Sequence, residues 1–207
     1  MTTVISNFST SLDGFIADLS DDVGPLFDWY SSGDVTLRPP GYPLEFHLSE
    51  ASARHWQEII DRSGAMVCGR RLFDHTRGWG GNPPVGAPTF VVSHRPPPED
   101  WPPVPDAPFT FVTDGLEAAV AAARTAAEAR ATPGTDPVVS VAGANIAQQC
   151  LNAGLLDEVW IDLVPVFLGE GIRYLSGLTP ADLELVRIIE GEGVTHLRYR
   201  VKGHRPA

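Results

Sequence analysis

The sequence predicts an α/β fold in which helices cover both faces of a mainly parallel sheet, so that the chain forms three layers. Short β-branched runs alternate with helix-like segments as far as about residue 160, and this alternation is typical of parallel sheets. The last two strand-like runs, 183–189 and 194–201, flank a Glu-Gly-Glu-Gly turn. Strands joined by a short glycine turn pair antiparallel, so we expect the sheet to end in an antiparallel hairpin.

Length and composition indicate a single domain over residues 1–207 that is soluble and cytoplasmic. A chain of this length with 43% hydrophobic residues can bury one sizeable core. The net charge of −11, without a basic stripe, argues against binding to nucleic acid. Apolar runs are shorter than the roughly twenty residues that span a membrane, and the first residues lack a signal-peptide pattern. Cys68 and Cys150 lie in apolar segments, so we expect reduced core thiols, no disulfide and no metal site.

The first half of the chain contains two strand-to-helix units separated by a long acidic and aromatic segment. Residues 2–8 form the first predicted strand, and Asp-Gly at 13–14 marks a turn after it. Residues 18–46 combine aspartates with aromatic residues. This mixture favours a lid or gate over a disordered linker, although a loop packed on the surface explains it nearly as well. A helix is predicted from Ser49 to about Arg62, then a strand over 65–68 and a second helix after Gly69.

The second half repeats this alternation. Strands are predicted over 88–93 and 109–113, and the ten prolines between 83 and 108 exclude regular structure between them. Asp114 and Glu117 resemble a capping box at the start of a helix over 115–130. A buried strand over 138–141 is followed by small residues, by a helix that ends before Gly154, and by a strand over 158–166.

Four strand ends carry residues suited to a phosphate-bearing cofactor, namely 11–14, 69–71, 93–95 and 142–144. The carboxyl ends of parallel strands meet at one edge of a sheet, where such folds bind ligands. Small residues before a helix expose backbone N–H groups, and arginine forks match phosphate oxygens. Each feature alone has an ordinary explanation, either tight strand–helix packing or a solvated arginine pair. Their convergence at one edge predicts a cofactor site.

Three motifs resemble the dihydrofolate-reductase-like superfamily, specifically the reductase domain of riboflavin biosynthesis, which is the C-terminal domain of the deaminase–reductase. They are SLDGFIA at 11–17, VCGRRLF at 67–73, and a block over 141–171 that contains VAGA, AGLLDE and PVFLGEG. The resemblance covers nearly the whole chain, least clearly 18–46 and 94–108. It implies a dihydrofolate-reductase-like three-layer sandwich. It also implies an NADPH-dependent reductase that transfers hydride to a small planar C=N or C=O substrate, such as a pteridine- or pyrimidine-like heterocycle.

The resemblance also implies a cofactor site with four parts. Ile16 and Ala17 would border the nicotinamide, and Gly69, Arg70 and Arg71 would hold the pyrophosphate and 2′-phosphate end. Ser93, His94 and Arg95 would flank the adenosine ribose. Gly143, Ala144, Asn145 and Ile146 would cap the pyrophosphate. Two positions depart from the family pattern. The family has Gly-Gly where this chain has Ala142-Gly143, at a bond often cis in dihydrofolate reductases, and a hydroxyl residue is common in place of Leu72.

The substrate side is less sharply indicated. The candidate proton donors are Asp13, Glu50 and His47, and we favour Asp13, although a turn-forming aspartate before glycine is an equally good explanation. The candidate substrate-binding residues are three aromatic side chains that could sandwich a ring and one acid: Trp29, Tyr30, Trp79 and Glu50.

Three further expectations concern function and assembly. A non-catalytic ligand-binding or dimerisation module that kept the fold is the alternative to a reductase. Residues 158–166 have apolar side chains on both faces, and related reductases pair through late strands, so we expect a homodimer. Dihydrofolate reductases hold the pterin with an acid on the first helix, and counting back from Gly69 places Ala53 there. We therefore expect a substrate other than dihydrofolate.

Overall fold

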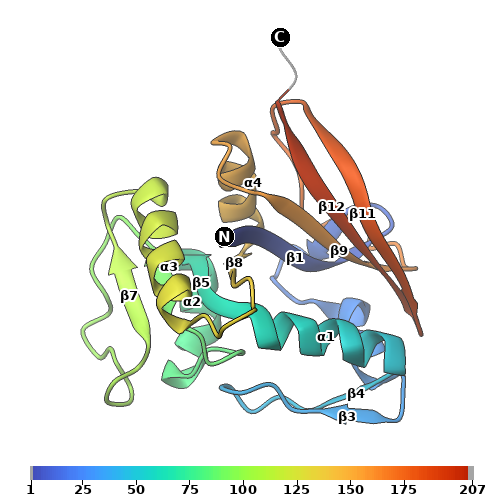
Figure 1. The fold of residues 1–207 in the computed structure, drawn as a ribbon, viewed down its shortest axis with the longest axis horizontal. Helices are drawn as coiled ribbons and strands as arrows, with labels where there is room; N and C mark the ends of the chain where they lie inside the picture. The colour runs from blue at the N-terminus through green and yellow to red at the C-terminus, as the bar shows by residue number, and fades with distance from the viewer. Residues whose placement is uncertain (1, 205–207) are drawn as a thin grey trace.

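The computed structural model describes residues 2–204 and contains an eight-stranded sheet between two layers of helices (Figure 1). The strand order is β11-β12-β9-β1-β8-β5-β6-β7. The six strands from β9 to β7 are parallel. β12 runs antiparallel to β9, and the edge strand β11 pairs antiparallel with β12. In chain order these strands are β1 Thr3–Ser11, β5 Ser63–Gly69, β6 Thr89–Val92, β7 Phe109–Val112, β8 Val138–Ala142, β9 Glu158–Val164, β11 Ala181–Gly191 and β12 Val194–His204. The predicted mainly parallel sheet with a C-terminal hairpin is confirmed.

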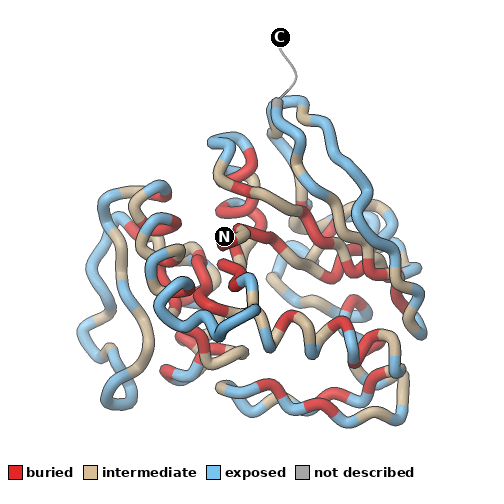
Figure 2. The backbone as a smooth tube through the Cα atoms, viewed as in Figure 1, coloured by how far each residue is buried: buried red, intermediate tan, exposed pale blue. Residues whose placement is uncertain are grey.

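The helices lie on opposite faces because the chain reverses its direction across the sheet. It moves from β1 to β5 and β6 through α1 (Glu50–Arg62) and α2 (Arg70–Thr76), and returns through α3 (Leu116–Arg130) and α4 (Ala144–Asn152). Right-handed crossovers in opposite directions place their helices on opposite faces. The core follows this division, since Val139 packs with α3 and α4 while Val138 packs with α1. Figure 2 shows the buried residues gathered between these layers.

Residues 18–46 form ordered elements instead of a plain loop. They contain the short helical turn η1 (Gly24–Ser31) and the strand β3 (Val35–Leu37), which pairs with β4 (Phe46–Leu48) beside α1 (Figure 1). Leu26, Trp29 and Phe46 are buried against Ala53 and Val164. The aromatic residues of this segment therefore supply a second hydrophobic core. Just before it, β2 (Phe15–Ala17) pairs with β10 (Ile172–Arg173).

Several helix boundaries follow from local chemistry. Ser49 caps α1 as expected, because its side chain accepts a hydrogen bond from the Ser52 N–H group. The capping box predicted at Asp114 is wrong. The N-cap residue of α3 is Gly115, whose φ of 102° needs glycine, and Asp114 therefore lies one residue before the capping position. Residues 77–81 form the short helical turn η2 (Arg77–Gly81), in which all five residues have positive φ.

Both cysteines are free and buried, as the sequence predicts. Burial raises the pKa of the Cys68 and Cys150 thiols to about 12, so both stay protonated near neutral pH. Across residues 2–204, no helix has the length and apolar character needed to cross a membrane.

Candidate active site

The carboxyl ends of four parallel strands bring the predicted cofactor residues to one edge of the sheet, called the carboxyl edge below. The strands β1, β8, β5 and β6 are consecutive neighbours and run in the same direction. They end at Ser11, Ala142, Gly69 and Val92. The four sequence segments singled out for a phosphate-bearing ligand therefore follow adjacent strand ends.

The first turn of α4 presents unpaired backbone donors at this edge. Gly143 is the N-cap residue, with φ of 97° and no side-chain cap. The first intrahelical bond runs from the Ala147 N–H group to the Gly143 carbonyl, at 3.0 Å. The three preceding N–H groups lie in the first turn, where a helix offers them no carbonyl partner. The positive φ at Gly143 requires glycine, and this chain has glycine there. The departure from the Gly-Gly pattern is at Ala142, a position that tolerates a side chain. The Ala142–Gly143 bond is trans.

The start of α2 lies against the start of α4. A Cβ atom added to Gly69 would lie 3.0 Å from the Ile146 side chain, and one added to Gly143 would lie 4.0 Å from Leu72. Glycine thus permits the close approach of the two strand-to-helix turns. The turn at Gly69 continues into Arg70 and Arg71, which add two guanidinium groups to the backbone donors of α4. This donor set fits the phosphates of a dinucleotide.

Arg70 is held in place by its neighbours. Its Nε donates to Asp74 at 2.7 Å and its Nη1 donates to the Pro96 carbonyl at 2.9 Å. Ser93, which is buried, accepts from the Arg95 N–H group and donates to the Arg95 carbonyl, and so fixes the turn after β6. The exposed Arg95 guanidinium lies 3.9 Å from Asp74. The segment after β6 is therefore tied to α2 through Arg70 and Asp74.

Arg71 points instead toward the segment that follows β2. Its side chain is 72% exposed and donates to Asp21 Oδ2 from Nη2 at 2.8 Å and from Nε at 3.3 Å. The remaining cofactor candidates are spread along the same edge. Ala17 is buried in β2 and Ile16 is half-buried, whereas His94 and Asn145 are exposed.

Asp13 occupies a site whose hydrogen bonds favour an ionised carboxylate. It accepts hydrogen bonds from Ser11 Oγ at 2.6 Å and from the N–H groups of Leu168 at 3.2 Å and Gly169 at 2.7 Å. These donors, Ser11 first, hold the pKa of Asp13 below its usual value. The geometry fits an anchor between two loops better than a proton donor.

The aromatic candidates do not gather into a ring sandwich. Trp29 is 2% exposed and donates its indole N–H to Ser9 at 3.0 Å. Tyr30 stacks on Phe46 with ring centroids 4.4 Å apart. Within residues 2–204, no ring contact joins Trp79 to either of them. Trp29 and Tyr30 are therefore packing residues of the second core in this structure.

The acidic and histidine candidates on the substrate side are exposed. Glu50 is 82% exposed, lies 3.3 Å from Arg54 and lines an open groove of about 400 Å³ between β3 and α1. His47 is exposed on β4, where its Nε2 lies 3.2 Å from Glu45. The groove at Glu50 is large enough for a small molecule.

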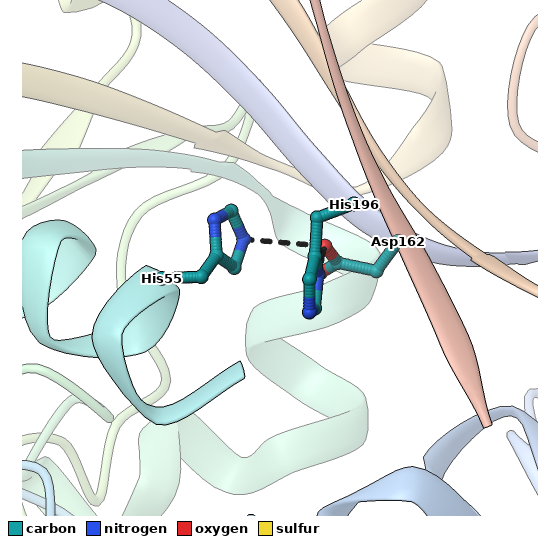
Figure 3. A group of neighbouring side chains, drawn as sticks. All are labelled: His55, Asp162 and His196. Carbon is teal, nitrogen blue, oxygen red and sulfur yellow. Dashed lines mark hydrogen bonds and ion pairs between the residues drawn. The ribbon is translucent and has the colours of Figure 1, made fainter. Parts of the chain in front are cut away.

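A buried group of His55, Asp162 and His196 lies between α1 and the strands β9 and β12 (Figure 3). Asp162 Oδ1 accepts from His196 Nδ1 at 2.6 Å, and His55 Nε2 lies 3.2 Å from the same oxygen without hydrogen-bond alignment. The other nitrogen of His196 lies 2.9 Å from Ser52 Oγ. All of these side chains are at most 4% exposed.

The electrostatics of this group favour an ionised Asp162. Burial alone would raise the pKa of Asp162, but the hydrogen bond from His196 and the adjacent His55 hold it well below its usual range. The two imidazole rings stack with centroids 4.1 Å apart and planes 24° from parallel. A metal ion would have to lie in both ring planes to bind both nitrogens, which nearly parallel stacked rings do not allow.

The family comparison identifies the architecture. The model of the RibD C-terminal domain matches residues 2–197 of the chain. The chain belongs to the RibD C-terminal domain family. No curated protein sequence matches the chain.

Solved structures show the same fold as this RibD-type domain. A putative riboflavin biosynthesis protein from Shewanella sp. PV-4 is 20% identical, with a TM-score of 0.72 over 98% of this chain and 100% of that one. A pyrimidine reductase-like protein from Corynebacterium diphtheriae is 14% identical, with a TM-score of 0.60 over 98% of this chain and 92% of that one.

The third neighbour is a larger protein. It is the diaminohydroxyphosphoribosylaminopyrimidine deaminase/5-amino-6-(5-phosphoribosylamino)uracil reductase from Thermotoga maritima, 14% identical with a TM-score of 0.60. The match covers 97% of this chain and 56% of that protein, so the RibD-type domain here spans little more than half of its length.

Sequence reasoning missed the buried group because its members share no local pattern. His55, Asp162 and His196 come from three elements that are far apart in the chain. One signal was present: Asp162 interrupts the apolar strand Glu158–Val164 at a position on the same side as Trp160 and Val164. An acid on a buried strand face is rare without partners.

Proposed function

We propose that this chain is an NADPH-dependent reductase that transfers hydride to a small planar heterocycle of the pyrimidine or pteridine type. The observation that carries this proposal is the pairing of the uncapped α4 turn at Gly143 with the Gly69-Arg70-Arg71 turn, in a member of a reductase family. The free backbone N–H groups of α4 and the two arginines that follow β5 lie at the same edge of the sheet, and donors of both kinds bind phosphate groups. A cytoplasmic enzyme of intermediary metabolism fits this assignment.

Each part of the carboxyl edge has a task in this proposal. The first turn of α4, residues 144–146, donates N–H groups to the pyrophosphate, and Arg70, Arg71 and Arg95 balance the phosphate charge. Ile16 and Ala17 offer an apolar border to the nicotinamide and exclude water from it. The bound cofactor supplies the hydride. The protein orients the reacting carbon and shields it from solvent.

The substrate is proposed to be a ring other than dihydrofolate. Ala53 is 7% exposed and packs against Leu26 and Trp29, so that position of α1 offers no carboxylate to an aminopyrimidine ring. The preceding residue, Ser52, is bonded to His196. Glu50, one turn earlier, lines the groove between β3 and α1 and is the acid best placed to contact a ring there.

A homodimer through the late strands is part of the proposal. Leu183, Leu185, Val186 and Ile188 on the edge strand β11 are between 41% and 53% exposed. A long edge strand with apolar side chains invites pairing with a second chain.

Titration of the purified protein with NADPH tests the cofactor assignment. The chain has five tryptophans, whose emission reports binding, and NADPH absorbance then reports turnover in a panel of aminouracil, pterin and other heterocyclic substrates. The aminouracil class is included because the Thermotoga relative is named as a reductase of such a ring. Silence of the emission up to millimolar NADPH would favour the non-catalytic alternative. Tight binding without turnover of any ring would leave a cofactor-binding protein that lost its activity.

A further inference from the structure

The residues after β2 form a tight turn that fixes the position of Asp21. The Asp18 carboxylate accepts from the N–H groups of Ser20 at 2.6 Å and Asp22 at 3.0 Å. Two backbone bonds close the same turn, from Asp18 N to the Asp22 carbonyl and from Asp21 N to the Asp18 carbonyl. Asp21 has a φ of 67°, which is uncommon for a residue other than glycine. Asp21 is therefore presented by a built turn.

This turn places the Asp21 carboxylate on a guanidinium of the proposed cofactor site. Asp21 Oδ2 receives both donors of Arg71, at 2.8 and 3.3 Å, and the Asp21 side chain is 27% exposed. The turn follows β1 and β2, whereas Arg71 follows β5, and β8 lies between β1 and β5 in the sheet. The ion pair thus connects the elements on both sides of β8, whose end leads into Gly143 and the first turn of α4.

We propose that Asp21 is a specificity-determining residue of the cofactor site, because its carboxylate occupies Arg71 in the free protein and competes with a cofactor phosphate for it. This inference rests on the proposed function. A carboxylate and a phosphate oxygen accept the same guanidinium donors, and the phosphate carries the larger charge. Binding of a phosphate group at Arg71 therefore releases Asp21, and the affinity is lowered by the strength of the pair that is broken.

Arg70, in contrast to Arg71, is held by partners in its own helix and in the segment after β6. It is 18% exposed, bonds to Asp74 four residues later in its own helix, and also binds the Pro96 carbonyl. Its contacts hold the backbone together and have no connection to the 18–22 turn. Arg71 pairs with Asp21 in a different segment, so its pairing can exchange without disturbing α2.

The test is the affinity of Asp21→Asn for NADPH and NADH, measured by tryptophan emission at low and high salt. Exposed ion pairs contribute about 0.2–1 kcal/mol, which corresponds to a change of about 1.4- to fivefold. We expect Asp21→Asn to bind NADPH tighter by about this factor, with a smaller gain at high salt. A gain for both cofactors assigns Arg71 to the pyrophosphate, and a gain for NADPH alone assigns it to the 2′-phosphate.

Asp22→Asn is the matched control. It removes the same charge one residue away, where the Asp22 carboxylate accepts from the Gly24 N–H group at 2.9 Å, a bond that asparagine keeps. Asp22→Asn is expected to gain less than Asp21→Asn. In an Arg71→Gln background, Asp21→Asn is expected to add nothing, and thermal melts check that all variants are folded.

The outcomes distinguish failure of the proposed role of Asp21 from failure of the proposed function. Equal effects of Asp21→Asn and Asp22→Asn, or a gain that persists in Arg71→Gln, would overturn the role of Asp21 while leaving the cofactor site in place. If neither the wild type nor any variant binds NADPH at millimolar concentration, the proposed function fails and this inference fails with it. Binding by Asp21→Asn where the wild type binds nothing would support the competition directly.

Discussion

Replacing Asp162 with asparagine would leave two buried histidines without the carboxylate that both of them face. Asp162 Oδ1 lies 2.6 Å from His196 Nδ1 and 3.2 Å from His55 Nε2, and the Asp162 side chain is 3% exposed. Water cannot take the place of the lost charge at that depth. Removing one partner of a buried charged group costs about 3–5 kcal/mol. For a chain of this size that corresponds to a fall of about 6–20 °C in Tm.

Urea unfolding followed by circular dichroism and by tryptophan emission measures this cost. Trp29 is a convenient reporter, since its ring meets His196 edge-on with centroids 5.2 Å apart. The control is Asp61→Asn on the exposed face of α1, where the carboxylate accepts from Gln57 at 2.7 Å and asparagine can do the same. We expect a change below about 0.5 kcal/mol for that variant. A loss below about 1 kcal/mol for Asp162→Asn would refute the view that the group carries charge in the folded protein.

The pH dependence gives a second measurement of the same group. The pKa of Asp162 is lowered in the folded state, so its contribution to stability is present above its unfolded pKa of about 3.9 and is lost as the pH falls toward the folded value. The wild type should therefore lose stability steeply on acidification below about pH 4. The asparagine variant lacks this component, and its stability should fall less steeply over the same range. Parallel acid curves for the two proteins would contradict the assignment.

Three further predictions follow from the cofactor edge, the first helix and the edge strand. Arg70→Glu and Arg71→Glu should each weaken NADPH relative to NADH, because a charge-assisted contact contributes about 1.5–3 kcal/mol; an unchanged affinity ratio in the fluorescence titration would refute a contact of these arginines with the 2′-phosphate. Dihydrofolate with NADPH should turn over near background, and a kcat in the usual range of roughly 1–10³ s⁻¹ would contradict the reading of Ala53. Light scattering should give twice the chain mass of 22.3 kDa at micromolar concentration. Ile188→Asp on the exposed side of β11 should shift the protein toward monomer. A monomeric wild type would exclude the homodimer.

The sequence was most informative where one local pattern determines one element. The β-branched run at 138–141 and the glycine at 154 fix the strand β8 and the end of α4, because strand propensity and left-handed glycine act over a few residues. The alternation of strand-like and helix-like segments was enough to predict parallel strands. Parallel strands in turn place the four cofactor segments at one edge of the sheet. Asp114 failed as a cap because a shift of one residue at Gly115 moves it out of the capping position.

The features that sequence reasoning missed depend on contacts between distant segments. Trp29 and Tyr30 look like ligand walls in an acidic segment, but η1 folds back so that both pack against α1 and β4. His55, Asp162 and His196 meet because α1 crosses the face formed by β9 and β12. The pairing of Asp21 with Arg71 joins two segments whose charges appear solvated in the sequence. No periodicity within one segment carries such information.

The position of β1 in the sheet has a consequence for how the chain reaches this fold. Its neighbours are β8 and β9, with Thr3 opposite Val138 and Ile5 opposite Glu158. During synthesis at about 5–20 residues per second, the first strand emerges many seconds before either neighbour exists. Val4 and Ile5, which are fully buried at the end, must stay in an unpaired strand throughout that interval. Pairing over such sequence separations is intrinsically slow, so the exposed first strand is the segment on which a chaperone would have the longest time to act.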